Sequence, residues 1–185
     1  MAPSRSTAST NARIAPDGTP WISFYDATNG RLKVAMGTAG TGCDSAAWTC
    51  TTVDSSADVG KWSTVAFGSD GKAWVGFYDT TNKAARVAQY VGTHAGSCTD
   101  DNWECTSIEG SSGFDVGSEG SLTIDAMGHP WFAYHDATNG RLRVARWVGG
   151  GGNCAGATWQ CGTVDASTSV GDFAAIAFDQ SGRAW

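Results

Sequence analysis

The sequence predicts an all-β protein, a β-propeller built of four-stranded antiparallel blades, and three observations lead to this prediction. One segment occurs three times, as "PWISFYDATNGRLKVA", "AWVGFYDTTNKAARVA" and "PWFAYHDATNGRLRVA". Each copy is followed by one closely spaced pair of cysteines. No segment has helical periodicity, and a repeat of about 55 residues that contains four strand-like segments has the size of a propeller blade.

The repeat starts near Asn11 and divides the chain into about three full blades and part of a fourth. Its most regular marker is a tryptophan early in the second strand, found at Trp21, Trp74, Trp131 and Trp185. After a disordered tail at 1–10, we expect blades at 11–62, 63–120 and 121–173, and an incomplete fourth repeat at 174–185. A closed ring normally has at least four blades, so we expect it to be completed by further sequence of the protein or by self-association.

The second repeat shows the four predicted strands most clearly. They are expected at 63–67, 73–79, 85–91 and 103–109. The turns between strands contain Asp70-Gly71, Asn29-Gly30 and Asn139-Gly140, which are residue pairs suited to positive φ.

The second strand is apolar on both faces up to its final aspartate, as expected for a sheet that lies between two others. Two places after the marker tryptophan, the copies carry the small residues Ser23, Gly76 and Ala133. A small residue there leaves room for a large side chain of the neighbouring blade. A β-sandwich is the alternative fold, but it would not require sequence identity at a fixed period.

The six cysteines form three C-x6-C pairs, and each pair has a tryptophan two residues before its second cysteine. We expect the disulfides Cys43–Cys50, Cys98–Cys105 and Cys154–Cys161, one in each blade. Closing such a short loop contributes roughly 2.5 kcal/mol on a loop-entropy estimate. Zinc is the alternative, but zinc sites favour shorter spacings, and no histidine lies at ligand spacing. Disulfides predict a secreted or extracytoplasmic protein.

Charge and hydropathy narrow the possible partners. The net charge is −6 and the twelve Lys and Arg residues are scattered, which argues against binding to nucleic acid. No run of 18 or more apolar residues occurs, so no membrane span is expected.

The repeated pattern G-x-P-W-[IVF]-x-[FY]-[YH]-D-x-T-N resembles the repeats of secreted bacterial β-propeller proteins, and the likeness covers nearly the whole chain from Asn11. A more distant likeness connects the turns to the Asp-box hairpins of sialidase-like propellers. The chain departs from that motif: the aspartate directly precedes the glycine in "APDGTPW" and "GSDGKAW", but lies three places before it in "DAMGHPW" and "DQSGRAW". The catalytic residues of sialidases therefore cannot be transferred to it.

Alternation of the strands predicts that the second-to-third turns and the connectors between blades share one side of the molecule. This side gathers carboxylate, amide, guanidinium and aromatic groups, which together suit a sugar site. The candidate ligand-binding residues are Asp26, Asn29, Arg31, Asp58, Trp62, Asp79, Asn82, Asp115, Asp136, Asn139 and Arg141. The competing interpretation is that Asp and Asn in these turns bind their own backbone.

No cofactor is expected. "DSSAD" at 54–58 offers oxygen ligands for calcium, but the third copy "DASTS" lacks the second carboxylate. Residues that break the repeat symmetry are His129, His135, Glu109 and Glu119, and none of them forms a recognised catalytic motif.

The sequence therefore predicts a secreted, non-catalytic, lectin-like propeller segment that binds carbohydrate or another extracellular ligand through repeated sites. Two alternatives stay open. The chain could be part of a propeller glycoside hydrolase or lyase, or a structural or adhesive scaffold.

Overall fold

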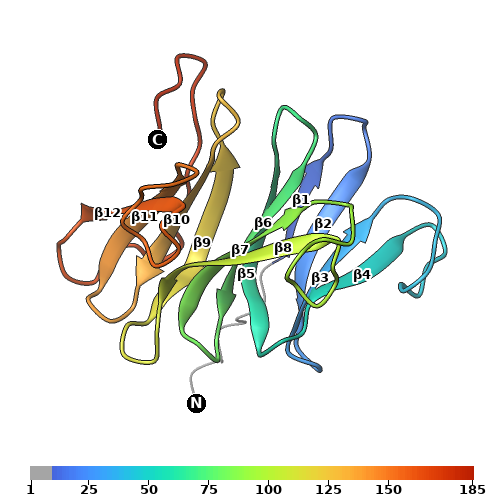
Figure 1. Ribbon diagram of the computed structural model, residues 1–185, viewed down its shortest axis with the longest axis horizontal. Coiled ribbons are helices and arrows are strands. Elements are labelled where there is room, and N and C mark those ends of the chain that lie inside the picture. Colours follow the sequence, from blue (N-terminus) through green and yellow to red (C-terminus); the bar gives the residue numbers. More distant parts are fainter. Residues whose placement is uncertain (1–9) are drawn as a thin grey trace.

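The computed structural model describes residues 10–185, which form three four-stranded antiparallel sheets in succession (Figure 1). Within each sheet the strands lie in chain order, so every sheet is a simple meander. The first sheet contains β1 (Thr10–Ile14), β2 (Pro20–Asp26), β3 (Arg31–Met36) and β4 (Thr49–Asp54). The second contains β5 (Val59–Phe67), β6 (Ala73–Asp79), β7 (Ala84–Tyr90) and β8 (Trp103–Gly110). The third contains β9 (Val116–Ile124), β10 (Pro130–Asp136), β11 (Arg141–Trp147) and β12 (Trp159–Asp165).

The sheets stack face to face, and the first strand of each lies against the preceding sheet. Strand β5 contacts β1, β2 and β3, and β9 contacts β5, β6, β7 and β8. This is the arrangement of blades in a β-propeller, so the predicted fold class is confirmed. The three expected disulfides are also present, one in each sheet.

The two ends of the described chain differ from the sheets. Residues 1–9 of the expected tail lie outside the described residues, and Thr10 is the first residue of β1. Residues 174–185 form a hairpin without a regular strand, closed by backbone hydrogen bonds between Ala177 and Trp185. The Phe178 ring packs against Trp131 at 5.5 Å between centroids, so this hairpin covers part of the third sheet.

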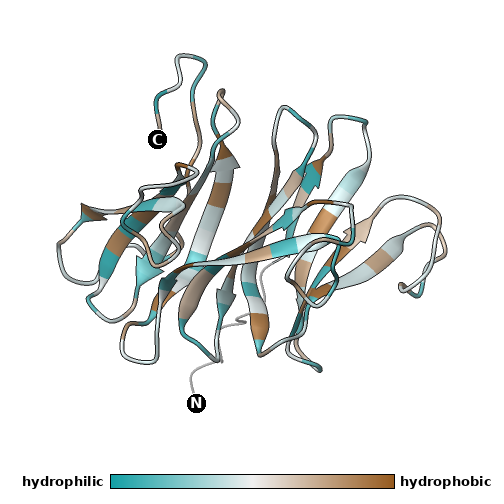
Figure 2. Cartoon of the chain, in the orientation of Figure 1, coloured by the Kyte–Doolittle hydropathy of each residue, from teal (hydrophilic) through white to brown (hydrophobic). Residues whose placement is uncertain are grey.

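Apolar side chains fill the two spaces between sheets, and one tryptophan contact recurs in both. Trp21 of the first sheet meets Trp103 of the second at 6.2 Å, and Trp74 of the second meets Trp159 of the third at 6.4 Å. The repeated tryptophans of the second strand and of the disulfide loop are therefore the two halves of one inter-sheet contact. Figure 2 shows the apolar stretches running along the strands.

The aspartate in the turn between the first and second strands has the same role whether it directly precedes the glycine or lies three places before it. In the Asp-Gly turns, Asp17 and Asp70 accept the N–H group two residues later. Where the aspartate lies three places before glycine, it also reaches the marker indole. Trp131 donates its Nε1–H to Asp125 at 3.0 Å, and Trp185 does the same to Asp179 at 3.3 Å. These aspartates hold the hairpin turns in shape.

Gly76, two places after the marker Trp74, leaves room for a large side chain of the neighbouring sheet, as predicted. A Cβ atom on Gly76 would lie 2.8 Å from the ring of Phe132, which is fully buried in the next sheet. The two sheets approach closely because position 76 lacks a side chain.

We expect Gly76→Ala to lower the free energy of unfolding by about 1–3 kcal/mol, because the buried Phe132 ring has no space to move into. The control is Gly162→Ala, since a Cβ atom there meets no atom within 4 Å. Urea denaturation followed by tryptophan fluorescence measures both. Equal stability of the two variants would contradict the close packing at Gly76.

Candidate functional site

The second-to-third turns and the connectors between sheets lie on one side of the molecule, which we term the connector face (the lower edge in Figure 1). In each turn, the aspartate that ends the second strand accepts bonds from the asparagine three residues later. The side-chain amide distances are 2.9 Å for Asn29–Asp26, 2.8 Å for Asn82–Asp79 and 2.9 Å for Asn139–Asp136. The backbone N–H of each asparagine also donates to the same aspartate. All six candidates therefore cap their turns.

The connector aspartates join neighbouring sheets. The Tyr25 hydroxyl of the first sheet donates to Asp58 at 2.6 Å, and the Tyr78 hydroxyl of the second donates to Asp115 at 2.7 Å. The backbone N–H of each aspartate donates to a threonine hydroxyl in the following sheet, Thr81 or Thr138. Each connector is thus fastened to the sheets on both sides of it.

These contacts shift the pKa values of Asp58 and Tyr25. Partial burial opposes the charge on Asp58, but hydrogen bonds from Tyr25 and Lys61 outweigh this effect and lower its pKa. Burial and the bond to Asp58 raise the pKa of Tyr25 to about 12. The tyrosine stays neutral and the carboxylate stays charged near neutral pH.

The third copy of this contact is built from different residues. Ser169 replaces the connector aspartate, His135 replaces the tyrosine, and His135 Nδ1 lies 3.4 Å from Asp172. The repeat thus keeps a link between the second strand and the connector although both partners have changed.

Trp62 lies where β5 is irregular. The register between β5 and β6 shifts on both sides of Lys61, and Trp62 has φ 51°. Glu119 and Phe173, at the equivalent positions, have φ 54° and 53°. A bulge re-aims the side chain, and here it places the Trp62 ring 5.4 Å from Tyr78, towards the second junction. Trp62 therefore packs against the neighbouring strand of its own sheet.

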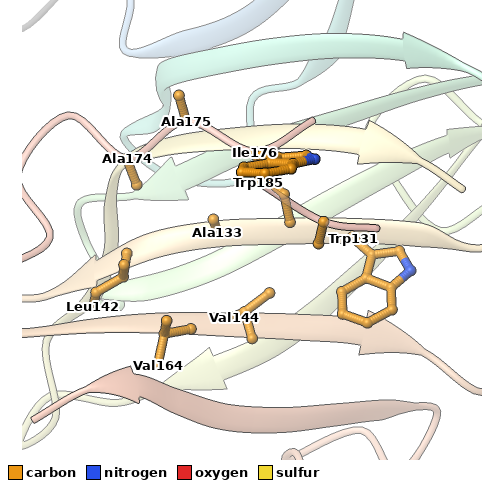
Figure 3. Close-up of a pocket in the computed structure, with 10 residues that line it drawn as sticks. Trp131, Ala133, Leu142, Val144, Val164, Ala174, Ala175, Ile176 and Trp185 are labelled. Carbon is orange, nitrogen blue, oxygen red and sulfur yellow. The ribbon is translucent and has the colours of Figure 1, made fainter. Parts of the chain in front are cut away.

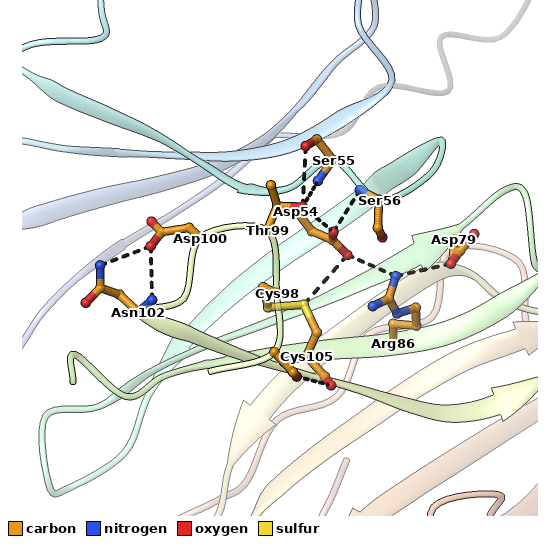
Figure 4. The surroundings of a disulfide bond; sticks show 11 residues. Asp54, Ser55, Ser56, Asp79, Arg86, Cys98, Thr99, Asp100, Asn102 and Cys105 are labelled. Atoms are coloured by element: carbon orange, nitrogen blue, oxygen red, sulfur yellow. Dashed lines mark hydrogen bonds and ion pairs between the residues drawn. A yellow bond between two sulfur atoms is a disulfide. The ribbon is translucent and has the colours of Figure 1, made fainter. Parts of the chain in front are cut away.

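Arg31 is exposed and Arg141 half-buried, and within the described residues neither forms a salt bridge. The basic residue two places later is the one that joins the sheets. Arg86 Nη1 lies 2.9 Å from Asp54 of the first sheet and 3.2 Å from Asp79, and only 1% of each carboxylate side chain is exposed (Figure 4). The guanidinium also lies 5.3 Å from the centre of the Phe77 ring.

The second junction has its own version of this ion pair. Arg143 binds both oxygens of Glu109, at 2.6 and 2.8 Å, and the Tyr134 hydroxyl donates to the same carboxylate at 2.7 Å. Sequence reasoning missed these residues, although a signal was present. The basic position is unbroken as Lys33, Arg86 and Arg143, and an acid closes each fourth strand, as Asp54, Glu109 and Asp165.

A polar cleft of about 400 Å³ opens beside Arg86 at the junction of the first and second sheets. Its lining residues are Ser56, Ala57, Asp79, Asn82, Arg86 and Ser107. At the second junction the residue equivalent to Ala57 is Phe114, whose ring lies 5.8 Å from the Arg143 guanidinium. A large ring therefore occupies the position that Ala57 leaves open.

The cleft brings together two of the sequence candidates, Asp79 and Asn82, and adds Arg86, which was not among them. The candidates Asp26, Asn29, Asp58, Trp62, Asp115, Asp136, Asn139, Arg31 and Arg141 do not line it. Both hydrogen-bonded and ionic contacts of Arg86 use Nη1, and within residues 10–185 neither Nε nor Nη2 donates to a protein group. The cleft therefore offers guanidinium, amide and hydroxyl groups to a ligand.

Within residues 10–185, no group of three or more His, Cys, Asp or Glu residues lies together as a metal site requires. Of the segment considered for calcium, Asp54 is held by Arg86 and Asp58 by Tyr25 and Lys61. In the same part of the chain, no helix has the length and apolar character needed to cross a membrane.

The fold and the cleft define the class of this chain: a repeat protein with propeller blades and a polar cleft between the first two of them. No protein-family model matches its sequence, and no curated protein matches it. Its structure is similar to that of a fucose lectin from Kordia zhangzhouensis, solved in complex with methyl-fucoside. The two chains share 15% identity, with a TM-score of 0.44, over 83% of this chain and 97% of the lectin chain. We infer a role for this chain from its own residues.

The Tyr25–Asp58 contact leads to a pH-dependent prediction. Because folding lowers the pKa of Asp58 below its ordinary value of 3.8, the carboxylate stabilises the fold above that pH. This stabilisation is lost as the pH falls through the pKa of the folded state. We expect Asp58→Asn to cost roughly 1 kcal/mol at pH 6, after allowing for solvent exposure, and less at pH 2.5.

Urea denaturation at a series of pH values measures this difference. The control is Asp44→Asn, an exposed aspartate in the first disulfide loop, for which we expect little change at any pH. A cost of Asp58→Asn that stayed constant down to pH 2.5 would refute the assigned role of its charge.

Proposed function

We propose that this chain is a secreted, non-catalytic protein that binds carbohydrate, and that the cleft between its first two sheets holds the sugar. The observation that supports this proposal best is the composition of the cleft. Arg86, Asn82, Asp79 and two serines converge on a space of about 400 Å³. Sugars are recognised by planar hydrogen-bonding groups fixed in place, because their hydroxyls both donate and accept.

The cleft is rigid before any ligand arrives. Arg86 is held by two buried carboxylates, and Asn82 is held through both its backbone and its side chain by Asp79. Fixed donors lose little conformational entropy on binding, which favours affinity for a small polar ligand. The same contacts favour binding over catalysis, since the guanidinium compensates the charge of both Asp54 and Asp79.

The three disulfides support the proposed location. Each closes a loop between the third and fourth strands of its sheet, as in proteins of an oxidising compartment. An extracytoplasmic protein meets glycans at cell surfaces and in the surrounding matrix.

We expect Ala57→Phe to abolish glycan binding at this cleft, because it places a ring over Arg86 as Phe114 lies over Arg143. The fold should be retained, since the second junction already carries that ring. Glycan-array screening followed by calorimetry measures the effect, and Thr168→Phe at the equivalent position of the third connector is the control. Undiminished binding by Ala57→Phe would remove this cleft as the site.

One observation favours the alternative in which the repeats also serve assembly. The outer face of the third sheet presents Trp131, Leu142, Val144 and Val164, and with residues 174–185 it forms an apolar pocket of about 220 Å³ (Figure 3). The equivalents of these residues in the first two sheets are buried between sheets. Val164 is 60% exposed.

The outer face of the first sheet carries the complementary half. Trp48 is equivalent to Trp103 and Trp159, which receive a tryptophan from the preceding sheet. Lys33, which lies over the Phe24 ring, is equivalent to Arg86 and Arg143, while Asp165 on the third sheet is equivalent to Asp54 and Glu109. A second copy could thus dock its first sheet on this third sheet, in place of residues 174–185.

We expect Asp165→Lys to weaken this self-association and a further Lys33→Asp change to restore it, because the double variant re-forms the pair with reversed charge. Sedimentation velocity over a range of protein concentrations measures association, and Asp44→Lys controls for the change in net charge. A monomer at every concentration would rule out docking of a second copy.

A further inference from the structure

We propose a second carbohydrate site on the opposite side of the molecule, where a glycan of two or more residues lies across an aromatic plate formed by Trp147 and His129. This side, termed the turn face, carries the turns between the first and second strands of each sheet (the upper edge in Figure 1). The inference takes its ligand class from the proposed function but rests on separate residues, and none of the ligand-binding candidates from the sequence lies there.

The plate stands at the junction of the second and third sheets. Trp147 ends β11, and His129 comes directly before β10. Their rings lie 5.9 Å apart at 34°, and 33% of the histidine side chain is exposed. Flat, partly exposed rings of this kind bind the apolar C–H face of a sugar by stacking, and the sugar hydroxyls then point to the side.

Polar hollows lie on both sides of this plate. One, of about 300 Å³, contains Asp70, Lys72 and Gln89 beside Trp74. The other, of about 270 Å³, contains Asp125 and Arg146. Met127, His129 and Trp147 line both hollows, so these three residues form the ridge between them. A ligand that fills both hollows must cross the ridge, which selects a chain of sugars over a single ring.

Hydrogen bonds to Asp125 hold the turn that carries His129 in place. This carboxylate accepts the N–H of Met127 at 2.9 Å, the N–H of His129 at 2.8 Å and the indole N–H of Trp131 at 3.0 Å. Partial burial opposes its charge, but these hydrogen bonds prevail and its pKa is lowered. Because the turn is already ordered, binding loses little entropy there.

The charges around the plate favour a neutral glycan. Asp70 lies 3.7 Å from Lys72, and the Arg146 guanidinium lies 5.4 Å from the centre of the Trp131 ring near Asp125. Each hollow thus holds one acidic and one basic residue. In the described part of the chain, the Gln89 side-chain amide makes no hydrogen bond to protein, so it can both donate to and accept from a hydroxyl.

The turn face of the first junction has a different arrangement of rings, so we place this site at the second junction only. An equivalent hollow of about 230 Å³ is lined by Asp17, Trp21 and Tyr90. There the rings of Trp21, Tyr90 and Trp103 pack against one another, at 5.3 to 6.2 Å. At the second junction Trp74 packs against Trp159, and Trp147 pairs with His129 at the surface. Tyr90, although 39% exposed, packs edge-on against two tryptophans, whereas the half-buried Trp147 has its ring tilted by only 34° to that of His129.

The test is NMR titration of ¹⁵N-labelled protein, following the indole N–H signals, with cellotriose, maltotriose, chitotriose and mannotriose and with their monosaccharides. We expect at least one trisaccharide to shift the Trp147 indole signal and to bind at least tenfold tighter than its monosaccharide. Trp147→Ala and Gln89→Ala should each weaken that binding at least fivefold. Tyr90→Ala, at the equivalent position of the first junction, should leave it unchanged.

Gln89→Ala removes only a half-buried polar group, so it tests the site even if Trp147→Ala fails to fold. The Ala57→Phe variant separates this inference from the proposed function. Trisaccharide binding that survives Ala57→Phe but is lost in Gln89→Ala supports the turn-face site. Binding that is lost in Ala57→Phe and unaffected by Gln89→Ala overturns it and leaves the connector-face site standing. The absence of any shift of the Trp147 signal at 10 mM trisaccharide also overturns it.

Discussion

The packing of each sheet against the next is the interaction on which the rest of this structure depends. A sheet with two apolar faces cannot be stable alone, because one face would always lie in water. Here the contact is made by tryptophans, Trp21 on Trp103 and Trp74 on Trp159, and the closeness of the second junction depends on the missing side chain of Gly76. The sequence repeats at a fixed period because each blade must supply a second-strand tryptophan to the next sheet and a disulfide-loop tryptophan to the preceding one.

Polar groups at the rims of these junctions are ordered by the apolar packing beneath them. Asp54 and Asp79 are almost completely buried, and their charges are tolerated because Arg86 reaches Asp79 from the adjacent strand and Asp54 across the junction. Glu109, Arg143 and Tyr134 form the corresponding group at the second junction. The network that closes the first junction thus also lines the cleft beside it, so the groups that would recognise a ligand are held by the same bonds that hold these blades together.

Small departures from the repeat turn similar junctions into different surfaces. Ala57 leaves open the space that Phe114 fills at the next junction. On the turn face, Tyr90 packs against Trp21 and Trp103, whereas its counterpart Trp147 packs against His129. The chain therefore combines a common blade with surfaces that differ from junction to junction.

The sequence by itself determined the blades and much of their detail. The period, the four strands of each copy, the three disulfides and the need for a small residue at Gly76 follow from local patterns, because turns, strand alternation and short disulfide loops are decided within a few residues. The turn-capping interpretation of Asp26, Asp79 and Asp136 was likewise open from the sequence. Only the tertiary structure decided which residues face a cleft. Arg86 meets Asp54 across a junction, Trp62 turns towards Tyr78 on the neighbouring strand, and Trp147 at the end of β11 meets His129 just before the paired strand β10. The first contact depends on the offset between stacked sheets, and the other two depend on the irregular geometry at the ends of paired strands, which no local pattern records.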